Sequence, residues 1–236
     1  MGLVTEKAKE ELVRVARKMA AGGLVVGTWG NLSCLVPRDG VVCITPSGMP
    51  YDVMQPEDVV VLDPEGRVVE GEHRPSTEWP LHLAVYRARP DAGAVIHTHS
   101  LWCSVLAVVR RGIPPIVEDM AQVLGGGVEV AEYAPPGTPE LAARTVAALG
   151  KANAALLANH GAVALGRSLA EAYVAARVLE KSAQIYVLAC LLGGAAALEA
   201  AEVEELRRQY LTSYGPGPAH RWPCGGPDPA GGACRA

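Results

Sequence analysis

Apolar residues recur along the chain with two different periods, which predict where helices and strands lie. From Thr5 to Met19 the apolar positions are three or four residues apart, as on one face of an amphipathic helix, and Gly22-Gly23 ends that pattern. Four short β-rich runs follow, separated in pairs by turn residues, which predicts two antiparallel hairpins. The paired runs are 32–36 with 41–45, and 59–62 with 67–69.

The rest of the chain alternates between helical and extended patterns. We predict helices at 77–88, 101–109, 138–149, 169–192 and 201–209. We predict strands at 92–98, near 115, and at 130–133, 154–158 and 162–165. Mixed strands covered by helices predict an α/β fold, a three-layer α/β/α sandwich around a central mixed, mostly antiparallel sheet.

Length and composition predict a single folded domain followed by a tail. With 236 residues the chain can bury one substantial core and is short for two full domains. After Tyr214 the composition changes to glycine and proline, which cannot bury enough apolar area to become ordered. The sequence therefore predicts a domain over residues 1–214 and a Gly/Pro-rich flexible tail over residues 215–236.

Charge and hydropathy exclude several classes of partner. The net charge is −4 and lysine and arginine are scattered, so the chain lacks the basic patch that nucleic-acid binding needs. The most apolar stretch, between Gln184 and Glu199, is well below the roughly 20 residues that span a bilayer. Residues 1–14 are charged and polar where an export signal would be apolar. We therefore expect a cytoplasmic protein whose partner is a small molecule.

Three histidines carry the strongest chemical signal. His97 and His99 lie two residues apart in an extended run, so the strand period puts both imidazoles on one face. His160 follows the apolar run 154–158 in an Asn-His-Gly turn and is the natural third ligand of a catalytic metal site. A lone histidine often only satisfies a carbonyl, but burying two imidazoles together is costly without a metal. We expect the other histidines to be structural or solvated: His73, His82 and His220.

A carboxylate and three polar loops accompany the histidines. Ser76 can cap a helix whose first turn tolerates Pro80, which puts Glu78 at the helix N-terminus; the alternative is that Glu78 only compensates the helix dipole. The loops 27–31, 45–48 and 76–77 offer backbone N–H groups and hydroxyls without cationic side chains. Proteins can bind phosphate in this way, although each loop is also an ordinary turn.

Five motifs follow one another along the chain: GTWGNLS at 27–33, ITPSGMPY at 44–51, PSTEWPLH at 75–82, HTH at 97–99 and LANHG at 157–161. In this order they resemble the class II aldolase and adducin-head family, most closely its L-fuculose-1-phosphate aldolase branch, over residues 5–214. The resemblance implies a homotetramer with one divalent ion per subunit, zinc or else manganese, cobalt or iron(II). It implies that the ion is bound by His97, His99 and His160, with Glu78 as a further ligand in the absence of substrate.

The same resemblance implies a role for each loop and for Glu78. Phosphate would be held by residues of the three loops: Thr28, Gly30, Asn31, Ser47, Gly48, Ser76 and Thr77. The implied reaction is the reversible, metal-dependent cleavage of a ketose 1-phosphate, L-fuculose 1-phosphate or a related deoxyketose 1-phosphate, into dihydroxyacetone phosphate and an aldehyde. The cation would stabilise developing negative charge while Glu78 moves the carbon-bound proton.

Three positions concern the aldehyde side. Glu118 stands where the fuculose enzyme has a tyrosine that reaches into a neighbouring subunit's site, and Pro136 replaces an aromatic residue. Tyr214 matches the C-terminal tyrosine of the family, which implies a catalytic role for it. Because the first two positions differ, we expect an aldehyde other than lactaldehyde, or one that is bound loosely.

Other functions on this scaffold stay open. L-Ribulose-5-phosphate 4-epimerases typically carry aspartate at the position of Glu78 and use a C-terminal histidine, whereas His220 lies here in the predicted tail. A methylthioribulose-1-phosphate dehydratase shares the metal ligands and a glutamate, so only its products separate it. An adducin-head-like binding module tends to lack the metal ligands. A Schiff-base aldolase needs a desolvated lysine, and no lysine lies in a predicted strand.

Overall fold

The computed structural model describes residues 3–215, so the predicted tail beyond Gly215 lies outside the described residues. The strands are β1 (Asn31–Val36), β2 (Val41–Ile44), β3 (Val60–Leu62), β4 (Val68–Glu70), β5 (Ala94–Thr98), β6 (Val130–Ala131), β7 (Ala154–Leu157) and β8 (Gly161–Gly166). The helices are α1 (Leu3–Ala21), α2 (Trp79–Ala88), α3 (Leu101–Val108), α4 (Glu118–Leu124), α5 (Pro139–Leu149), α6 (Leu169–Leu191) and α7 (Ala200–Gln209). Two short helical turns, η1 (Pro56–Asp58) and η2 (Tyr210–Tyr214), complete the described elements.

All strands form one sheet in the order β4-β3-β2-β1-β5-β8-β7-β6. Every neighbouring pair is antiparallel except β6 and β7, which are parallel. The predicted hairpins are β1-β2 and β3-β4, and β5 lies between β1 and β8. The mixed, mostly antiparallel sheet that the sequence predicted is thus confirmed.

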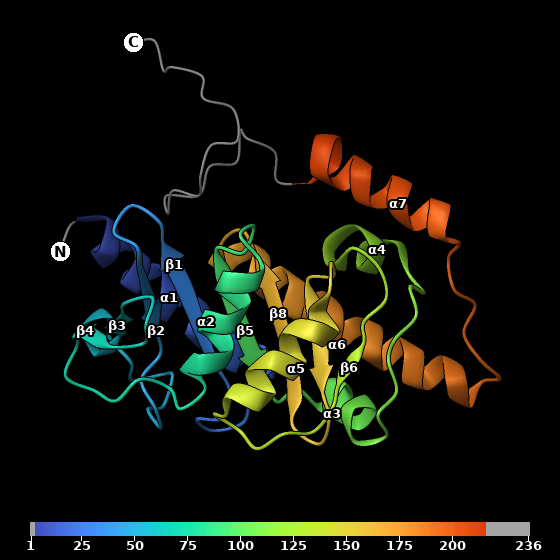
Figure 1. Cartoon of the computed structure of the whole chain (residues 1–236). Helices are drawn as coiled ribbons and strands as arrows, with labels where there is room; N and C mark the ends of the chain where they lie inside the picture. Colours follow the sequence, from blue (N-terminus) through green and yellow to red (C-terminus); the bar gives the residue numbers. More distant parts are fainter. Residues whose placement is uncertain (1–2, 216–236) are drawn as a thin grey trace, which may run out of the picture.

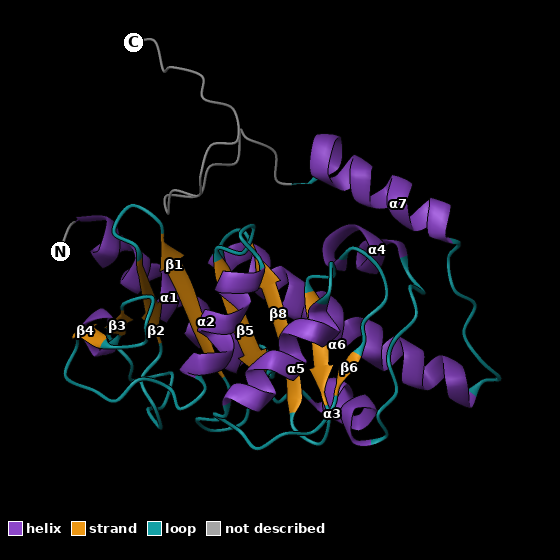
Figure 2. Ribbon diagram, in the orientation of Figure 1, coloured by secondary structure: helices purple, strands orange, loops and turns teal. Residues whose placement is uncertain are grey.

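Helices cover both faces of the sheet, as Figures 1 and 2 show, with α2 and α5 in front of it and α1 and α6 behind it. The strand period of two divides the core accordingly. Ala94 and Ile96 of β5 belong to the cluster beneath α1, α3, α4 and α6. Val95 belongs to the cluster beneath α2 and α5. The predicted three-layer sandwich is therefore the observed fold.

Two local predictions differ from the structure. No strand forms near residue 115, because Pro114 and Pro115 lack the N–H groups that a ladder requires. Instead Ile113 makes a single antiparallel bridge to Val128. The helix α4 was not predicted, and it packs beneath α7, where Arg207 donates hydrogen bonds to the carbonyls of Gln122 and Val123. Among residues 3–215, no helix combines the length and the apolar character needed to cross a membrane.

Candidate metal centre and active site

The C-terminal end of β5 carries two of the histidines. His97 lies within the strand and is fully buried, and His99 follows one residue after the strand ends at Thr98. Their ring centroids are 4.8 Å apart and their Nε2 atoms 2.9 Å apart. The Nδ1–H of His97 donates to the carbonyl of Ala162 in β8 at 3.0 Å. A carbonyl only accepts, so this bond fixes the tautomer and leaves Nε2 with its lone pair toward the centre of the site.

His160 reaches the same place from the turn between β7 and β8. Its ring centroid lies 4.7 Å from that of His97 and 4.9 Å from that of His99. The turn depends on Asn159, which has a left-handed φ of 56°, a conformation that asparagine adopts more readily than most residues. It also depends on Gly161, where a Cβ would lie 2.2 Å from the carbonyl oxygen of Thr98. The sequence motif Asn-His-Gly is thus the local cause of the position of His160.

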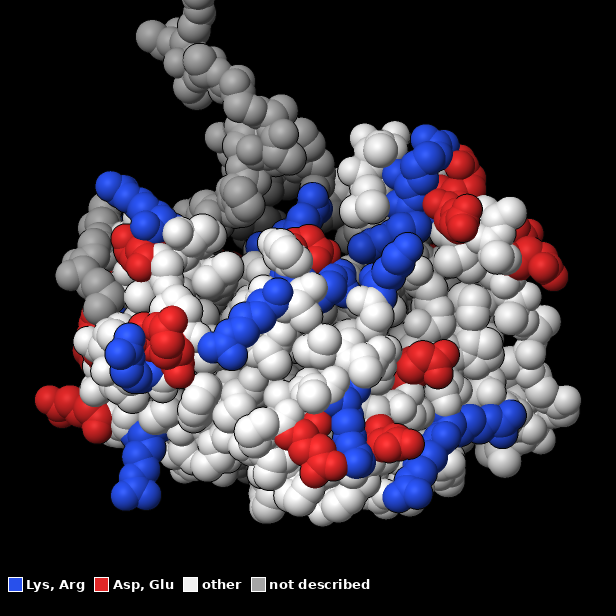
Figure 3. Space-filling model, viewed as in Figure 1, with Lys and Arg blue, Asp and Glu red and all other residues white. Residues whose placement is uncertain are grey.

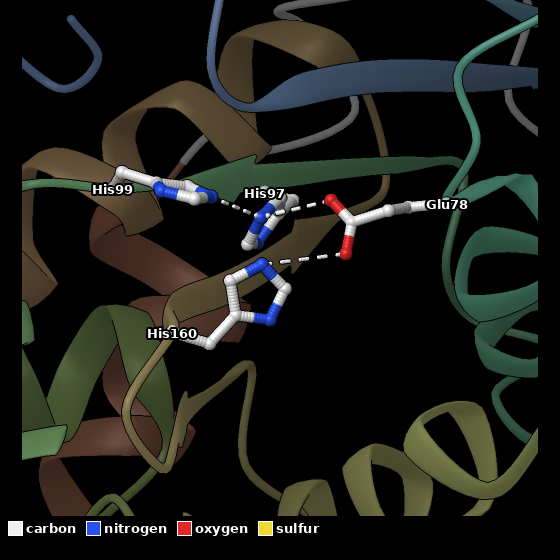
Figure 4. Close-up of side chains that lie close together, drawn as sticks. All are labelled: Glu78, His97, His99 and His160. Carbon is white, nitrogen blue, oxygen red and sulfur yellow. Dashed lines mark hydrogen bonds and ion pairs between the residues drawn. The ribbon is translucent and has the colours of Figure 1, made fainter. Parts of the chain in front are cut away.

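Glu78 completes the cluster from the opposite side, as Figure 4 shows. It is the N-cap residue of α2, where its N–H donates to Ser76 Oγ at 3.3 Å. Its Oε2 lies 3.0 Å from His97 Nε2, and its Oε1 lies 3.4 Å from His160 Nε2. The ligand atoms of Glu78, His97, His99 and His160 all lie within 4.8 Å of one another. The structure therefore brings together the four residues that the sequence predicted as metal ligands, and their binding of a metal stays a prediction.

The chemistry of this donor set fits a divalent cation. Among the described residues, Glu78 Oε1 and His160 Nδ1 are buried without a hydrogen-bond partner, which is costly for a purely structural cluster. Burial, with a smaller contribution from the neighbouring His97, lowers the pKa of His99 and of His160 to about 4. Both imidazoles are therefore neutral near pH 7, which is the form that binds metals.

Glu78 stays ionised in this environment. Its burial alone would raise its pKa, but His97, His160 and the hydrogen bond from Asn31 outweigh burial and hold the pKa well below the ordinary value. A carboxylate that is buried and ionised beside three imidazoles has the composition of a catalytic zinc-type site, which uses nitrogen and oxygen ligands.

The three polar loops adjoin this cluster. The N–H of Ser76 donates to the carbonyl of Thr45 at 3.0 Å, which joins the second and third loops. Tyr51, just after the second loop, donates its hydroxyl to the carbonyl of Gly30 at 2.6 Å and so joins it to the first. Gly30 has φ 92°, and a Cβ there would lie 2.8 Å from the carbonyl oxygen of His97. The loops therefore lie together, against the strand β5 that carries His97.

The residues predicted to bind phosphate differ in exposure. Ser47, Gly48 and Thr77 are exposed, Thr28 and Gly30 are half-buried, and Asn31 and Ser76 are buried. The Asn31 side chain points inward, where its Nδ2 donates to Glu78 Oε2 at 3.0 Å. Phosphate binding by these residues stays a prediction.

Glu118 and Tyr214 are not part of the cluster within one chain. Glu118 is the exposed first residue of α4 and lines a cavity of about 700 Å³. The lining of that cavity is Ile116, Val117, Glu118, Asp119, Gln122, Leu198 and Gln209, without any of the four clustered residues. The backbone of Tyr214 ends η2, and its side chain lies outside the described part of the chain. The roles assigned to both residues stay predictions.

Three further residues near the site were missed from the sequence. His82, predicted to be structural or solvated, is fully buried and hydrogen bonds to both Asn31 and Ser33. Tyr86 also bonds to Ser33. The helical spacing of four from Glu78 to His82 and on to Tyr86 puts these three side chains on one helix face, but it does not indicate what that face contacts.

The surface carries no large region of one charge on the face shown. Figure 3 shows lysine and arginine interspersed with aspartate and glutamate over the face that bears α2 and α5. Lys9 of α1 is the one buried lysine among the described residues. It is paired with Glu6 and Glu70, away from the cluster. No lysine of the described chain is among the residues of the cluster.

Comparison with known proteins agrees with this geometry. The family described as the Class II Aldolase and Adducin N-terminal domain matches residues 10–187. The chain is 36% identical over 208 residues to the 5-deoxy-D-ribulose 1-phosphate aldolase of Bacillus thuringiensis serovar kurstaki, covering 88% of this chain and 97% of that protein. It is 38% identical over 204 residues to the 5-methylthioribulose-1-phosphate/5-deoxyribulose-1-phosphate aldolase of Rhodospirillum rubrum, covering 86% and 90%. A solved structure of an L-fuculose 1-phosphate aldolase has a TM-score of 0.84 and 39% identity, covering 86% of this chain and 96% of that one.

The chain therefore belongs to the class II aldolase and adducin N-terminal domain family, and the resemblance to its fuculose branch is confirmed. Within that family the protein is a sugar-phosphate aldolase, an enzyme of the lyase class. The alternative of a binding module without catalytic activity is set aside, because aldolase relatives cover most of the chain and all four clustered residues are present.

Proposed function

We propose that the protein reversibly cleaves a ketose 1-phosphate, L-fuculose 1-phosphate or a related deoxyketose 1-phosphate, into dihydroxyacetone phosphate and an aldehyde. The observation that carries this proposal is the cluster of His97, His99 and His160 with Glu78, whose Oε1 has no hydrogen-bond partner among the described residues. A divalent cation bound there would supply the polarisation of a carbonyl and the stabilisation of the negative charge that develops beside it. Glu78 is close enough to the same centre to move the proton.

The roles of the chain's own residues follow from their positions. The three histidines would hold the cation through their ring nitrogens, and the bond from His97 to the carbonyl of Ala162 orients the most buried of them. In the cleavage direction, Glu78 returns a proton to the carbon that becomes the hydroxymethyl carbon of dihydroxyacetone phosphate. In the synthesis direction it removes that proton. A carboxylate kept ionised at neutral pH suits the synthesis direction, because it is ready to accept.

The phosphate would be held by the three adjoining loops. Ser47, Gly48 and Thr77 are exposed residues, and Ser76 and Thr77 precede the N-terminus of α2. Backbone N–H groups and a helix N-terminus attract a phosphate without a cationic side chain. Binding the phosphate at one end of the substrate would hold the carbonyl near the cation and so fix which carbon faces Glu78.

For the aldehyde we propose a small apolar product. The relatives from Bacillus and Rhodospirillum are named for 5-deoxyribulose 1-phosphate and 5-methylthioribulose 1-phosphate. Cleavage of these two compounds would release acetaldehyde and methylthioacetaldehyde. Trp29 is 66% exposed, its ring centroid lies 5.8 Å from that of His99, and it offers an apolar surface for such a product. The replacement of the family tyrosine by Glu118 also supports an aldehyde other than lactaldehyde.

Several finer features stay predictions from the sequence. They are zinc as the native ion, a homotetramer in which Glu118 approaches a neighbouring copy's site, a catalytic role for Tyr214, and a cytoplasmic location. Each has its own simple test, by metal analysis, light scattering, substitution and fractionation, respectively. None of them is needed for the chemistry proposed for His97, His99, His160 and Glu78.

Cleavage of a panel of ketose 1-phosphates, coupled to detection of dihydroxyacetone phosphate, tests the proposal. The panel contains 5-deoxyribulose, 5-methylthioribulose and fuculose 1-phosphates, and Glu78→Gln is compared with wild type. Glu65→Gln is the matched control, because Glu65 is an exposed acid of the β3-β4 turn. We expect activity on the first two substrates, a loss of about 10²-fold or more in Glu78→Gln, and no change in Glu65→Gln.

Other products would point to the other reactions of this scaffold. Cleavage of fuculose 1-phosphate alone would overturn the proposed aldehyde but leave the aldolase intact. Loss of water from 5-methylthioribulose 1-phosphate would identify a dehydratase, and conversion of L-ribulose 5-phosphate to its epimer would identify an epimerase. Either result, without dihydroxyacetone phosphate, would overturn the proposed reaction.

A further inference from the structure

A continuous chain of side-chain hydrogen bonds leads from the interior of the protein to Glu78. Tyr86 Oη lies 2.8 Å from Ser33 Oγ, and Ser33 Oγ lies 2.6 Å from His82 Nδ1. His82 Nε2 lies 2.5 Å from Asn31 Oδ1, and Asn31 Nδ2 lies 3.0 Å from Glu78 Oε2. His82, Asn31, Ser33 and Glu78 are all buried.

Two elements build this chain by their own periods. Glu78, His82 and Tyr86 are spaced by four along α2 and so share one helix face. Asn31 and Ser33 are spaced by two along β1 and so share the sheet face that α2 covers. Asn31 is also the register partner of His97 in β5. The chain of bonds therefore ends beside the metal ligands.

The charge of Glu78 determines the direction of every bond. An ionised carboxylate only accepts, so the Asn31 amide must present its nitrogen to Glu78 and its oxygen to His82. His82 must then donate from Nε2, and in its neutral form Nδ1 is left to accept from the Ser33 hydroxyl. Ser33 in turn accepts from the Tyr86 hydroxyl, which completes a single ordered arrangement. Every donor in it points toward Glu78.

We propose that His82 is a positioning residue for Glu78 in the aldol reaction, and this inference rests on the proposed function. A terminal amide has two orientations of similar intrinsic energy, and only one of them gives Glu78 a donor. The Nε2–H of His82 selects that orientation by occupying Asn31 Oδ1. Asn31 then holds Oε2 of Glu78 and leaves Oε1, which has no hydrogen-bond partner among the described residues, as the oxygen that carries the proton.

Two substitutions of His82 separate positioning from a purely structural role. His82→Leu removes both hydrogen bonds at similar volume, whereas His82→Gln keeps a side-chain donor and an acceptor. Since misplacing a reacting group by about 1 Å can cost roughly 10²-fold, we expect His82→Leu to lower kcat on that scale. We expect KM for the ketose 1-phosphate and bound metal per chain to stay within about twofold of wild type. His82→Gln should recover most of kcat.

A second reaction and a second variant complete the test. Exchange of the carbon-bound proton of dihydroxyacetone phosphate in D2O, followed by NMR, reports the Glu78 step without C–C cleavage and should fall in parallel with kcat. Ser33→Ala leaves the core volume almost unchanged, and it replaces His82→Leu in the test if His82→Leu does not fold. Loss of one hydrogen bond should lower its kcat and exchange rate about fivefold. His73→Leu, at a half-exposed histidine paired with Asp58, is the matched control and should change neither.

The outcomes separate the inference from the function on which it rests. Suppose that the wild type turns over and that His82→Leu, or Ser33→Ala where that variant is used, has the same kcat and the same exchange rate. That result would overturn the role of His82 and leave the proposed function intact. A fall in kcat with a parallel loss of bound metal and no recovery in His82→Gln would also overturn it, because His82 would then only support the fold. A wild-type protein that neither cleaves nor exchanges would overturn the proposed function and the role of His82 with it.

Discussion

Gly161→Ala should disable the active site although the substitution adds one methyl group. The Cβ built at Gly161 would lie 2.2 Å from the carbonyl oxygen of Thr98 and 3.5 Å from Cε1 of His97. A carbon and a carbonyl oxygen ordinarily stay about 3.3 Å apart, so β8 and β5 must separate by about 1 Å. These strands carry or adjoin His97, His99 and His160, and the turn that holds His160 moves with Gly161.

The size of the effect follows from that displacement. Overpacking of this kind costs about 1–3 kcal/mol of the free energy of unfolding, and a displacement of about 1 Å at a reacting centre costs roughly 10²-fold in kcat. The assay compares urea unfolding, bound metal after dialysis and aldol cleavage for wild type and Gly161→Ala. We expect Gly161→Ala to retain less metal than wild type after dialysis. We expect its cleavage activity to fall far more than the amount of folded protein does.

Gly150→Ala provides the matched control. Gly150 has a left-handed φ of 48°, and a Cβ there meets no atom within 4 Å. The substitution should cost about 1–3 kcal/mol through backbone strain, because residues other than glycine rarely combine φ 48° with ψ −119°, and it should leave metal content and kcat unchanged. If Gly161→Ala retained wild-type activity and metal, the contact between the β7-β8 turn and β5 could not be what positions His160.

Three other perturbations have defined outcomes. Burial lowers the pKa of His82 to about 3, below its ordinary value in the unfolded chain, so the unfolded state binds more protons and stability falls as pH drops from about 6.5 toward 3. In urea unfolding of metal-free protein, the free energy of unfolding of His82→Gln should therefore change less steeply with pH than that of wild type, by up to about 1.4 kcal/mol per pH unit. An identical slope in the two proteins would contradict the burial of His82. Tyr51→Phe removes the bond to the carbonyl of Gly30 and should raise KM about fivefold at constant kcat in steady-state assays, whereas an unchanged KM would separate this loop from phosphate binding. Asn159→Val should lower the free energy of unfolding by about 1–2 kcal/mol, because Asn159 has φ 56°. In urea denaturation, Asn159→Gly should be closer to wild type in stability than Asn159→Val, and a less stable Asn159→Gly would refute the strain.

Local patterns predicted the clustered histidines, because their spacing expresses strand geometry directly. His97 and His99 converge as the period of two predicted, although β5 ends at Thr98 and His99 lies just beyond it. Helix α4 could have been predicted from its acidic first turn at Glu118 and Asp119 and from Gly125 after its end. Its short length concealed the periodicity.

The supporting residues could not be predicted because they depend on pairing between distant segments. His82 contacts Asn31 and Ser33 across separations of 51 and 49 residues. A buried histidine in a helix is usually part of a satisfied core, so nothing in α2 alone distinguishes it. Only the placement of α2 over β1 turns its polar residues into a connection to Glu78. The inward direction of Asn31 likewise depends on a distant segment, because the β1-β5 register pairs it with His97.

The most direct test of the account is to restore metal to chelated wild-type protein in measured steps while following release of dihydroxyacetone phosphate from 5-deoxyribulose 1-phosphate. The account predicts that the chelated protein is inactive and that activity rises in proportion to bound metal, reaching its maximum at one ion per chain. The His160→Ala variant should bind the ion weakly and stay inactive at the metal concentration that fully activates wild type. Full cleavage activity in the chelated protein would contradict the account, because Glu78 and the histidines would then not act through a shared ion.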